Sequence, residues 1–244
     1  MKISGNKILI TGATSGIGKA LAEKFCQLDN IVVAIGRNET RLEELSRHDG
    51  RMIPFKCDVS SPSDINALLK FLKKEHQDLN VLINNAGIQY DLRFDDERYT
   101  AQSIDAEIST NISGPIKLIF GLLPILENNL NSSIVNVSSG LAIVPKASSA
   151  VYCGTKAAIH IFSKSLRYQL KNTKVFEIIP PLVDTEMTKG RGKGKIEPHI
   201  LVEEFIKAFR KNRYEVNIHK VKLLRIINRI SPKLAEALIK SRTS

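Results

Sequence analysis

Cysteine, tryptophan and long apolar runs are scarce in this chain of 244 residues, which has three cysteines and no tryptophan. Cys26, Cys57 and Cys153 lie at spacings that match neither a zinc site nor a disulfide framework. None of the five histidines falls at a metal-ligand spacing, so we expect no bound metal. So few cysteines suit a reducing compartment, and we expect a cytoplasmic protein.

A membrane-spanning segment is also missing from the sequence. The longest apolar stretch, residues 116–126, contains Lys117 and Pro124 and is too short to cross a bilayer as a helix. The first residues show no basic leader followed by an apolar run and a cleavage site. We therefore expect neither a span nor a secretion signal. The apolar content of 43% suits one large α/β domain.

Acidic residues are too few to balance the basic ones, and the formal net charge is +11. Residues 186–244 carry 15 lysines and arginines against 6 acids, a net +9, which leaves +2 for residues 1–185. The basic end lacks interleaved aromatic residues and any recognised DNA-binding motif. We therefore expect no nucleic-acid partner.

Short β-branched runs alternate with longer helical patterns along most of the chain. This alternation predicts an α/β protein with a single Rossmann-type, doubly wound parallel sheet of about seven strands, flanked by helices. Strands are expected at residues 7–11, 31–35, 52–56, 81–85, 133–137 and 175–179, with helices that include residues 16–26, 64–75, 112–126 and 149–170.

A glycine-rich loop follows the first predicted strand and opens a helix. Its glycines would allow the backbone to approach a pyrophosphate, whose charge would lie at the positive amino end of that helix. Such loops also occur for packing reasons alone, so the motif needs support from other positions. The candidate cofactor-binding residues of this loop are Gly12, Thr14, Ser15, Gly16, Ile17 and Gly18.

The second strand ends in Gly36, Arg37 and Asn38, where a dinucleotide site places an acidic residue to bind ribose hydroxyls. Arg37 can instead form charge-assisted hydrogen bonds to a 2'-phosphate. We therefore predict NADP(H) as the cofactor in preference to NAD(H), with Arg37 and Asn38 as contacts. The alternative is that Arg37 is a solvated surface residue.

Together these positions resemble the short-chain dehydrogenase/reductase family over residues 5–187. The resemblance comprises the TGxxxGxG loop, an NNAG run, Asn111, a serine thirteen residues before a tyrosine, and the YxxxK pair. Several strings, among them SSGLA and PPLVDT, also resemble a bacterial DltE-like oxidoreductase subgroup.

Tyr152 and Lys156 are four residues apart on one predicted helix, so both side chains face the same way and the ammonium can lower the pKa of the phenol. Alone, such a pair is more often a surface pair. The resemblance implies that Tyr152 donates a proton to a carbonyl oxygen, Ser139 orients that oxygen, Lys156 also holds the nicotinamide ribose, and Asn111 completes a proton relay. The adjacent Ser138 would point the other way from Ser139.

The resemblance implies further cofactor contacts at Asp58, Val59, Asn85, Ala86, Gly87, Val183 and Thr185. Asp58 could equally cap the following helix. After the sixth strand the family has a Pro-Gly step, whereas this chain has Pro180 and Pro181. Pro181 fixes φ and supplies no backbone donor, so the loop path is expected to differ.

The basic carboxyl end contains an amphipathic helical pattern over residues 220–230, with Leu223, Leu224, Ile227 and Ile230 on one face and Lys222, Arg225 and Arg229 on the other. Ser231 and Pro232 begin a second helix. The first helix could dock on the domain, pack in an oligomer or lie on an anionic membrane, and the membrane is not favoured.

The expected organisation is a nucleotide-binding domain over residues 1–215, with a glycine-rich, basic substrate lid near residues 186–198, and an extension of strand and helices over residues 216–244. We predict an oxidoreductase that moves hydride between NADP(H) and a small-molecule carbonyl or alcohol, as a homodimer or homotetramer. The alternative is a non-catalytic nucleotide-binding or membrane-surface protein that acts through its basic helix. The intact Ser139, Tyr152 and Lys156 argue against it.

Overall fold

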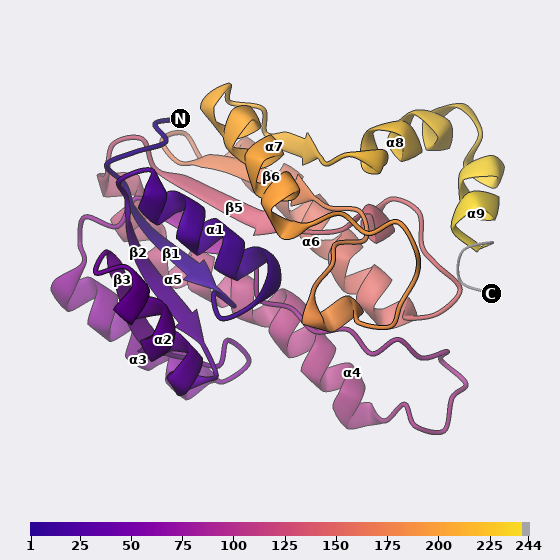
Figure 1. The fold of residues 1–244 in the computed structure, drawn as a ribbon, viewed down its shortest axis with the longest axis horizontal. Coiled ribbons are helices and arrows are strands. Elements are labelled where there is room, and N and C mark those ends of the chain that lie inside the picture. Colours follow the sequence, from indigo (N-terminus) through magenta and orange to yellow (C-terminus); the bar gives the residue numbers. More distant parts are fainter. Residues whose placement is uncertain (241–244) are drawn as a thin grey trace.

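A parallel sheet of seven strands forms the centre of the computed structural model, which describes residues 1–240 (Figure 1). The strand order is β3-β2-β1-β4-β5-β6-β7, with every neighbouring pair parallel. The doubly wound sheet predicted from the sequence is confirmed. The strands are β1 (Lys7–Thr11), β2 (Ile31–Gly36), β3 (Met52–Lys56), β4 (Val81–Asn84), β5 (Ser133–Val137), β6 (Lys174–Ile179) and β7 (Glu215–Asn217).

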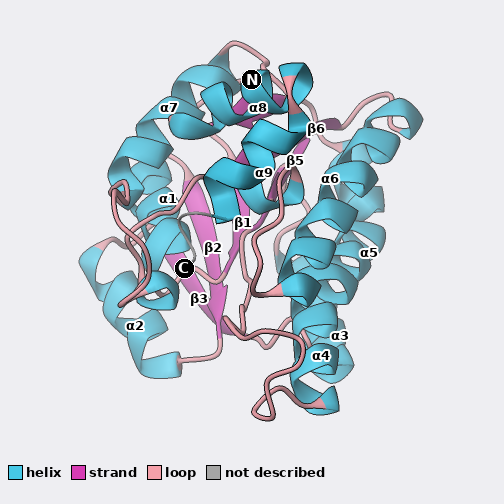
Figure 2. Ribbon diagram, turned by 90° about the vertical axis from the view of Figure 1, so that its right-hand side faces the viewer, coloured by secondary structure: helices cyan, strands magenta, loops and turns pink. Residues whose placement is uncertain are grey.

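Helices cover both faces of the sheet (Figure 2). Successive residues of β1 point to opposite faces, so Ile8 and Ile10 pack in one core and Leu9 in the other. The first core includes side chains of α1 (Gly16–Gln27), α2 (Glu39–His48) and α7 (Pro198–Arg210). The second includes side chains of α3 (Pro62–Glu75), α5 (Gly114–Asn128) and α6 (Ala150–Gln169).

The helix α4 (Ala101–Ile108) continues through a π-helical turn, Ser109–Ser113, into α5. By length and composition alone, the combined helix Ala101–Asn128 could cross a membrane. Buried core helices of soluble proteins pass the same test. Its inner face holds the buried polar residues Glu107 and Asn111. A Cβ on Gly114 would lie 2.4 Å from the backbone oxygen of Val59, so this helix packs closely against the loop after β3.

The basic carboxyl end docks on the body of the protein. The strand β7 crosses the expected boundary at residue 215 and is followed by α8 (Lys220–Ile230) and α9 (Pro232–Lys240). Val221 and Ala235 are buried, and Lys222 pairs with Glu204 at 2.6 Å. The last four residues of the expected extension, 241–244, lie outside the described residues.

Candidate active site

A cavity of about 1490 Å³ opens at the carboxyl ends of the strands, where the strand order reverses between β1 and β4. Most of the predicted site residues line it, whereas Gly18, Asn38 and Asn111 do not. The residues that do are Gly12, Thr14, Ser15, Gly16, Ile17, Arg37, Asp58, Val59, Asn85, Ala86, Gly87, Ser139, Tyr152, Lys156, Val183 and Thr185.

The glycine-rich loop forms the floor of the cavity at the start of α1. Gly18 must lack a side chain because a Cβ there would lie 2.2 Å from the backbone oxygen of Gly12. Gly16 has a φ of +52°, in the left-handed region that favours glycine. Ser15 precedes α1 without capping it through its side chain, which leaves the first backbone N–H groups of the helix available for a phosphate.

Arg37 lies exposed on the cavity wall and makes no hydrogen bond or ion pair with any described residue. Its free guanidinium and the uncapped end of α1 therefore suit the phosphates of a dinucleotide. Asn38 has a structural role, because its side chain caps α2 by accepting a hydrogen bond from the backbone N–H of Arg41 at 3.0 Å. Arg41 in turn pairs with Glu186 at 3.0 Å.

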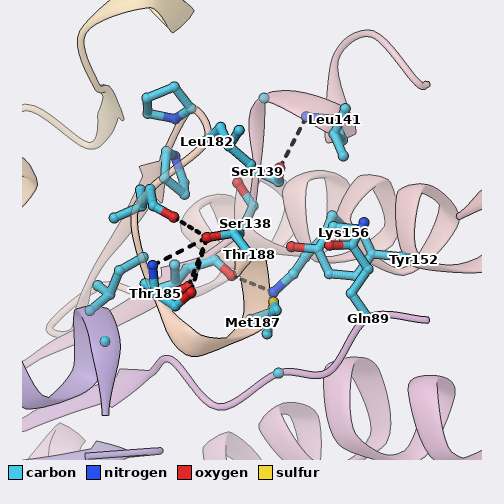
Figure 3. Close-up of a pocket in the computed structure, with 18 of the residues that line it drawn as sticks. Gln89, Ser138, Ser139, Leu141, Tyr152, Lys156, Leu182, Thr185, Met187 and Thr188 are labelled. Atoms are coloured by element: carbon cyan, nitrogen blue, oxygen red, sulfur yellow. Dashed lines mark hydrogen bonds between the residues drawn. The ribbon is translucent and has the colours of Figure 1, made fainter. Parts of the chain in front are cut away.

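Tyr152 and Lys156 lie side by side on the inner face of α6 (Figure 3). The Nζ of Lys156 donates to the backbone oxygen of Val137 at 2.9 Å and lies 5.6 Å from the centroid of the Tyr152 ring. Burial lowers the pKa of Lys156 to about 8, and the negative charge of Glu177 opposes that change. Burial raises the pKa of Tyr152 above its usual range, with a hydrogen bond to Ser139 acting against it. Tyr152 is therefore protonated at neutral pH, and the expected lowering of its pKa by Lys156 is not found.

The two adjacent serines after β5 point in different directions. The side chain of Ser139 accepts a hydrogen bond from the backbone N–H of Leu141 at 3.1 Å and lies on the cavity side, near Tyr152. The hydroxyl of Ser138 instead donates to the buried carboxylate of Glu177. Both serines line the cavity, and Ser139 stays the predicted catalytic serine.

Asn111 lies behind the cavity wall, in the π-helical turn, with 1% of its surface exposed. Its Oδ1 accepts from the backbone N–H of Ile88, and its Nδ2 donates to the backbone oxygen of Ile88, both at 2.9 Å. A Cβ on Gly87 would lie 3.2 Å from Asn111 Oδ1 and 3.5 Å from Lys156 Nζ. Asn111 thus fixes the loop after β4 next to the ammonium group.

The remaining predicted contacts belong to loops around the cavity. The Oδ1 of Asp58 accepts from the backbone and hydroxyl of Ser60, and Ser61 caps α3, so the alternative that Asp58 caps this helix is wrong. Asn85 donates to the backbone oxygen of Thr11 at 2.9 Å, which joins the loop after β4 to the glycine-rich loop. A Cβ on Gly16 would lie 2.9 Å from the methyl group of Thr185, so Thr185 covers that glycine.

A polar latch, which the sequence did not predict, joins the segment 186–198 to the loop after β4. Arg191 donates to Oε1 of Gln89 at 2.9 Å, and its Nε lies 3.5 Å from Asp91. Asp91 also accepts from Lys146 and Ser148, and although burial raises the pKa of Asp91, these hydrogen bonds lower it to about 2. The only sign of this latch in the sequence is that the loop after β4 carries the acidic Asp91 and the segment 186–198 carries the basic Arg191.

Comparison with known proteins identifies the family. The short chain dehydrogenase family model matches residues 6–195. The chain is a short-chain dehydrogenase/reductase. It is 39% identical to the uncharacterized oxidoreductase DltE of Bacillus subtilis, over 92% of each chain. It is 32% identical to an NADP-dependent 3-hydroxy acid dehydrogenase of Schizosaccharomyces pombe, over 79% of this chain and 77% of that one.

A solved short chain dehydrogenase from Burkholderia cenocepacia, in complex with NADP, is similar over 98% of this chain and 99% of its own, with 25% identity and a TM-score of 0.88. As a short-chain dehydrogenase/reductase, the protein is an oxidoreductase that acts on CH–OH or C=O groups. Asn111, Ser139, Tyr152 and Lys156 remain predicted catalytic residues.

In this short-chain dehydrogenase/reductase, α8 and α9 form an apolar roof over the cavity. Leu223, Leu224 and Ile227 of the expected apolar face of α8 line the cavity, where Leu224 and Ile227 are half-buried and Leu223 is 60% exposed, whereas Ile230 is 79% exposed and does not line it. Val221, which is 2% exposed, anchors the helix on the body of the protein. The roof residues that line the cavity are Val221, Leu223, Leu224, Ile227, Leu238 and Ile239.

Proposed function

We propose that this enzyme is an NADP(H)-dependent carbonyl reductase, or the reverse alcohol dehydrogenase, with Ser139, Tyr152 and Lys156 as its catalytic residues and Asn111 as their support. The observation that carries this proposal is the buried pair of Tyr152 and Lys156 beside Ser139, in a cavity that also contains the uncapped end of α1. A proton donor next to a phosphate-binding helix end is what hydride transfer to a carbonyl requires.

The unpaired guanidinium of Arg37 supports NADP(H) over NAD(H). Arg37 is flanked by the uncharged Gly36 and Asn38, and the next acidic residue, Glu39, is paired with Lys56 at 3.1 Å. The Schizosaccharomyces relative is named NADP-dependent, and the Burkholderia structure contains NADP. We assign the adenine end to Asp58 and Val59, the adjacent ribose to residues 85–87, and the nicotinamide end to Val183 and Thr185.

When bound, the nicotinamide would supply or accept the hydride. Tyr152 gives its proton to the carbonyl oxygen, and Ser139 donates a hydrogen bond to the same oxygen. The ammonium group of Lys156 stabilises the phenolate that remains, and it binds the nicotinamide ribose. Asn111 keeps the loop after β4 against Lys156, so that a proton can return to Tyr152 through a relay.

The roof supports an apolar carbonyl compound as the substrate, because α8 and α9 present six aliphatic side chains to the cavity. In a series of linear ketones and aldehydes, kcat/KM should rise with chain length. Replacing Leu224 and Ile227 with alanine should remove this dependence and leave the shortest substrates unaffected. Equal activity across the series in both proteins would contradict the assignment.

We infer a homodimer, or a homotetramer built from it, through the outer faces of α5 and α6. Three large apolar side chains are exposed there: Phe120 by 81%, Ile161 by 61% and Tyr168 by 83%. A group of such side chains is typical of a surface that a partner subunit covers. Sedimentation should give a dimer that Phe120→Glu and Tyr168→Glu weaken. The three cysteines are buried and free, which supports a cytoplasmic enzyme.

Replacement of Tyr152 by phenylalanine tests the catalytic assignment. It removes the proton donor and retains the ring, so NADPH should still bind while carbonyl reduction falls by at least about 100-fold. Retained turnover would refute the role of Tyr152. Loss of both NADPH binding and turnover would show instead that the variant disrupts the cofactor site.

A further inference from the structure

Glu177 is a fully buried carboxylate in β6, with 0% of its surface exposed. A carboxylate at such a position is costly unless it is hydrogen-bonded and near positive charge. Its oxygens lie 2.8 and 3.0 Å from Nδ1 of His160, and they also accept the hydroxyl of Ser138. Among the described residues, the side chains of Ser138 and His160 thus make the hydrogen bonds of the Glu177 carboxylate. Neither side chain has a role in the proposed catalysis.

Both partners are next to catalytic residues. Tyr152, Lys156 and His160 follow one another at intervals of four residues on the inner face of α6. The first two reach the cavity, and the third meets Glu177. Ser138 immediately precedes Ser139, and its hydroxyl donates to Glu177, whereas the Oγ of Ser139 accepts from the backbone N–H of Leu141. Glu177 therefore contacts a neighbour of Lys156 and a neighbour of Ser139.

The charge of Glu177 also acts on Lys156 directly. Burial lowers the pKa of Lys156 to about 8, and the carboxylate of Glu177 raises it against that burial. The only hydrogen bond of the Lys156 ammonium that the structure gives is to a backbone oxygen, so no carboxylate contacts it. A buried ammonium without a contacting anion depends on charges in the next layer of side chains.

We propose that Glu177 is a positioning residue of this active site: its carboxylate, held by Ser138 and His160, keeps Lys156 protonated and fixes the turn that presents Ser139. This inference rests on the proposed function, in which Lys156 acts as an ammonium group. The residue works through its neighbours and touches neither substrate nor cofactor.

The other charged groups around Glu177 are accounted for. The neighbouring strand β5 carries no charge, and on β7 the residue in register with Glu177 is Glu215. Glu215 is paired with Arg225 of α8 and lies 3.6 Å from Arg167 of α6. Burial raises the pKa of Glu215, but Arg225 and the charges of His160 and Lys164 on α6 lower it. With these cations around it, Glu215 is a matched control on the same face of the sheet.

The test is the titration of Lys156 in the full-length protein, followed through the side-chain carbons of ¹³C-labelled lysine by NMR and assigned with Lys156→Arg. Glu177→Gln removes the charge and keeps the shape, so the midpoint of Lys156 should fall by about one pH unit, a tenfold change in its protonation equilibrium. Glu177→Asp should restore most of that shift, and Glu215→Gln should leave the midpoint at its wild-type value. An unchanged midpoint in Glu177→Gln overturns the inference.

His160→Gln provides a second test that does not depend on the folding of Glu177→Gln. It keeps an amide donor for the carboxylate, so the Lys156 midpoint should stay at or above the wild-type value. A fall would overturn the inference, because Glu177, still present and hydrogen-bonded, would then not be sufficient to keep Lys156 protonated. In carbonyl reduction, the alkaline limb of kcat/KM should move to lower pH in Glu177→Gln. A shifted NMR midpoint in a protein that reduces no carbonyl would support the role of Glu177 and refute the proposed function.

Discussion

Arg37→Ala should reduce the affinity for NADPH and leave the affinity for NADH unchanged. Hydrogen bonds to charged groups contribute about 1.5–3 kcal/mol each, which corresponds to roughly 10- to 150-fold in a dissociation constant. Arg37 makes no ion pair among the described residues, so no existing interaction has to be broken when a phosphate binds. Its exposure lets salt screen the contact, and we expect a loss of about tenfold at physiological ionic strength.

The assay is a titration of nicotinamide fluorescence with NADPH and NADH, at low and physiological salt. Arg41→Ala is the matched control, because Arg41 is already paired with Glu186 and should change the NADPH affinity less than threefold. Arg37→Asp should reverse the preference in favour of NADH, since a carboxylate can accept ribose hydroxyls and repels the phosphate. Equal losses for both cofactors in Arg37→Ala, or an unchanged NADPH affinity, would refute the reasoning.

Three further predictions concern stability, pH and the lid. Gly18→Ala should lower the free energy of unfolding by about 1–3 kcal/mol, because the added Cβ would meet the glycine-rich loop. Gly154→Ala should raise it by about 0.5–1 kcal/mol, because Gly154 lies in open space on α6. Thermal unfolding measures both changes. Because burial lowers the pKa of Lys156 to about 8, its ammonium form is lost as pH rises, so reduction should decline above about pH 8. Any activity that Lys156→Arg retains should stay flat there, and a parallel decline would assign that limb to another group. Arg191→Ala should release the lid and speed NADPH dissociation severalfold in stopped-flow measurements, with less than about 0.5 kcal/mol of lost stability; an unchanged rate would mean that the latch does not control release.

The sheet was the most predictable part of the molecule, because a parallel strand is buried on both faces and its sequence is continuously apolar. The strand Lys7–Thr11 agrees with its prediction at both ends. The π-helical turn Ser109–Ser113 was not predicted, since its extra residue depends on the packing of Asn111 and carries no sequence period.

Side-chain roles were harder to predict than positions. Asn38 caps a helix although it directly follows Arg37, because a short polar side chain satisfies a nearby backbone N–H more readily than a distant ligand. The burial of Val221 in α8 was not predicted, because Val221 is not distinguishable in sequence from the other aliphatic residues of that helix. The latch between Arg191 and Gln89 joins residues 102 positions apart, which local patterns do not reveal.

The roof over the cavity comes from the last two helices of the described chain, α8 and α9, which follow all seven strands in the sequence. Neither helix contributes a residue to the nucleotide loop, the tyrosine-lysine pair or either core. We therefore expect substitutions in α8 and α9 to change the substrate range without changing the cofactor. For engineering, the same arrangement makes the carboxyl terminus an exchangeable module, in which libraries of roof sequences can be screened on one constant catalytic body.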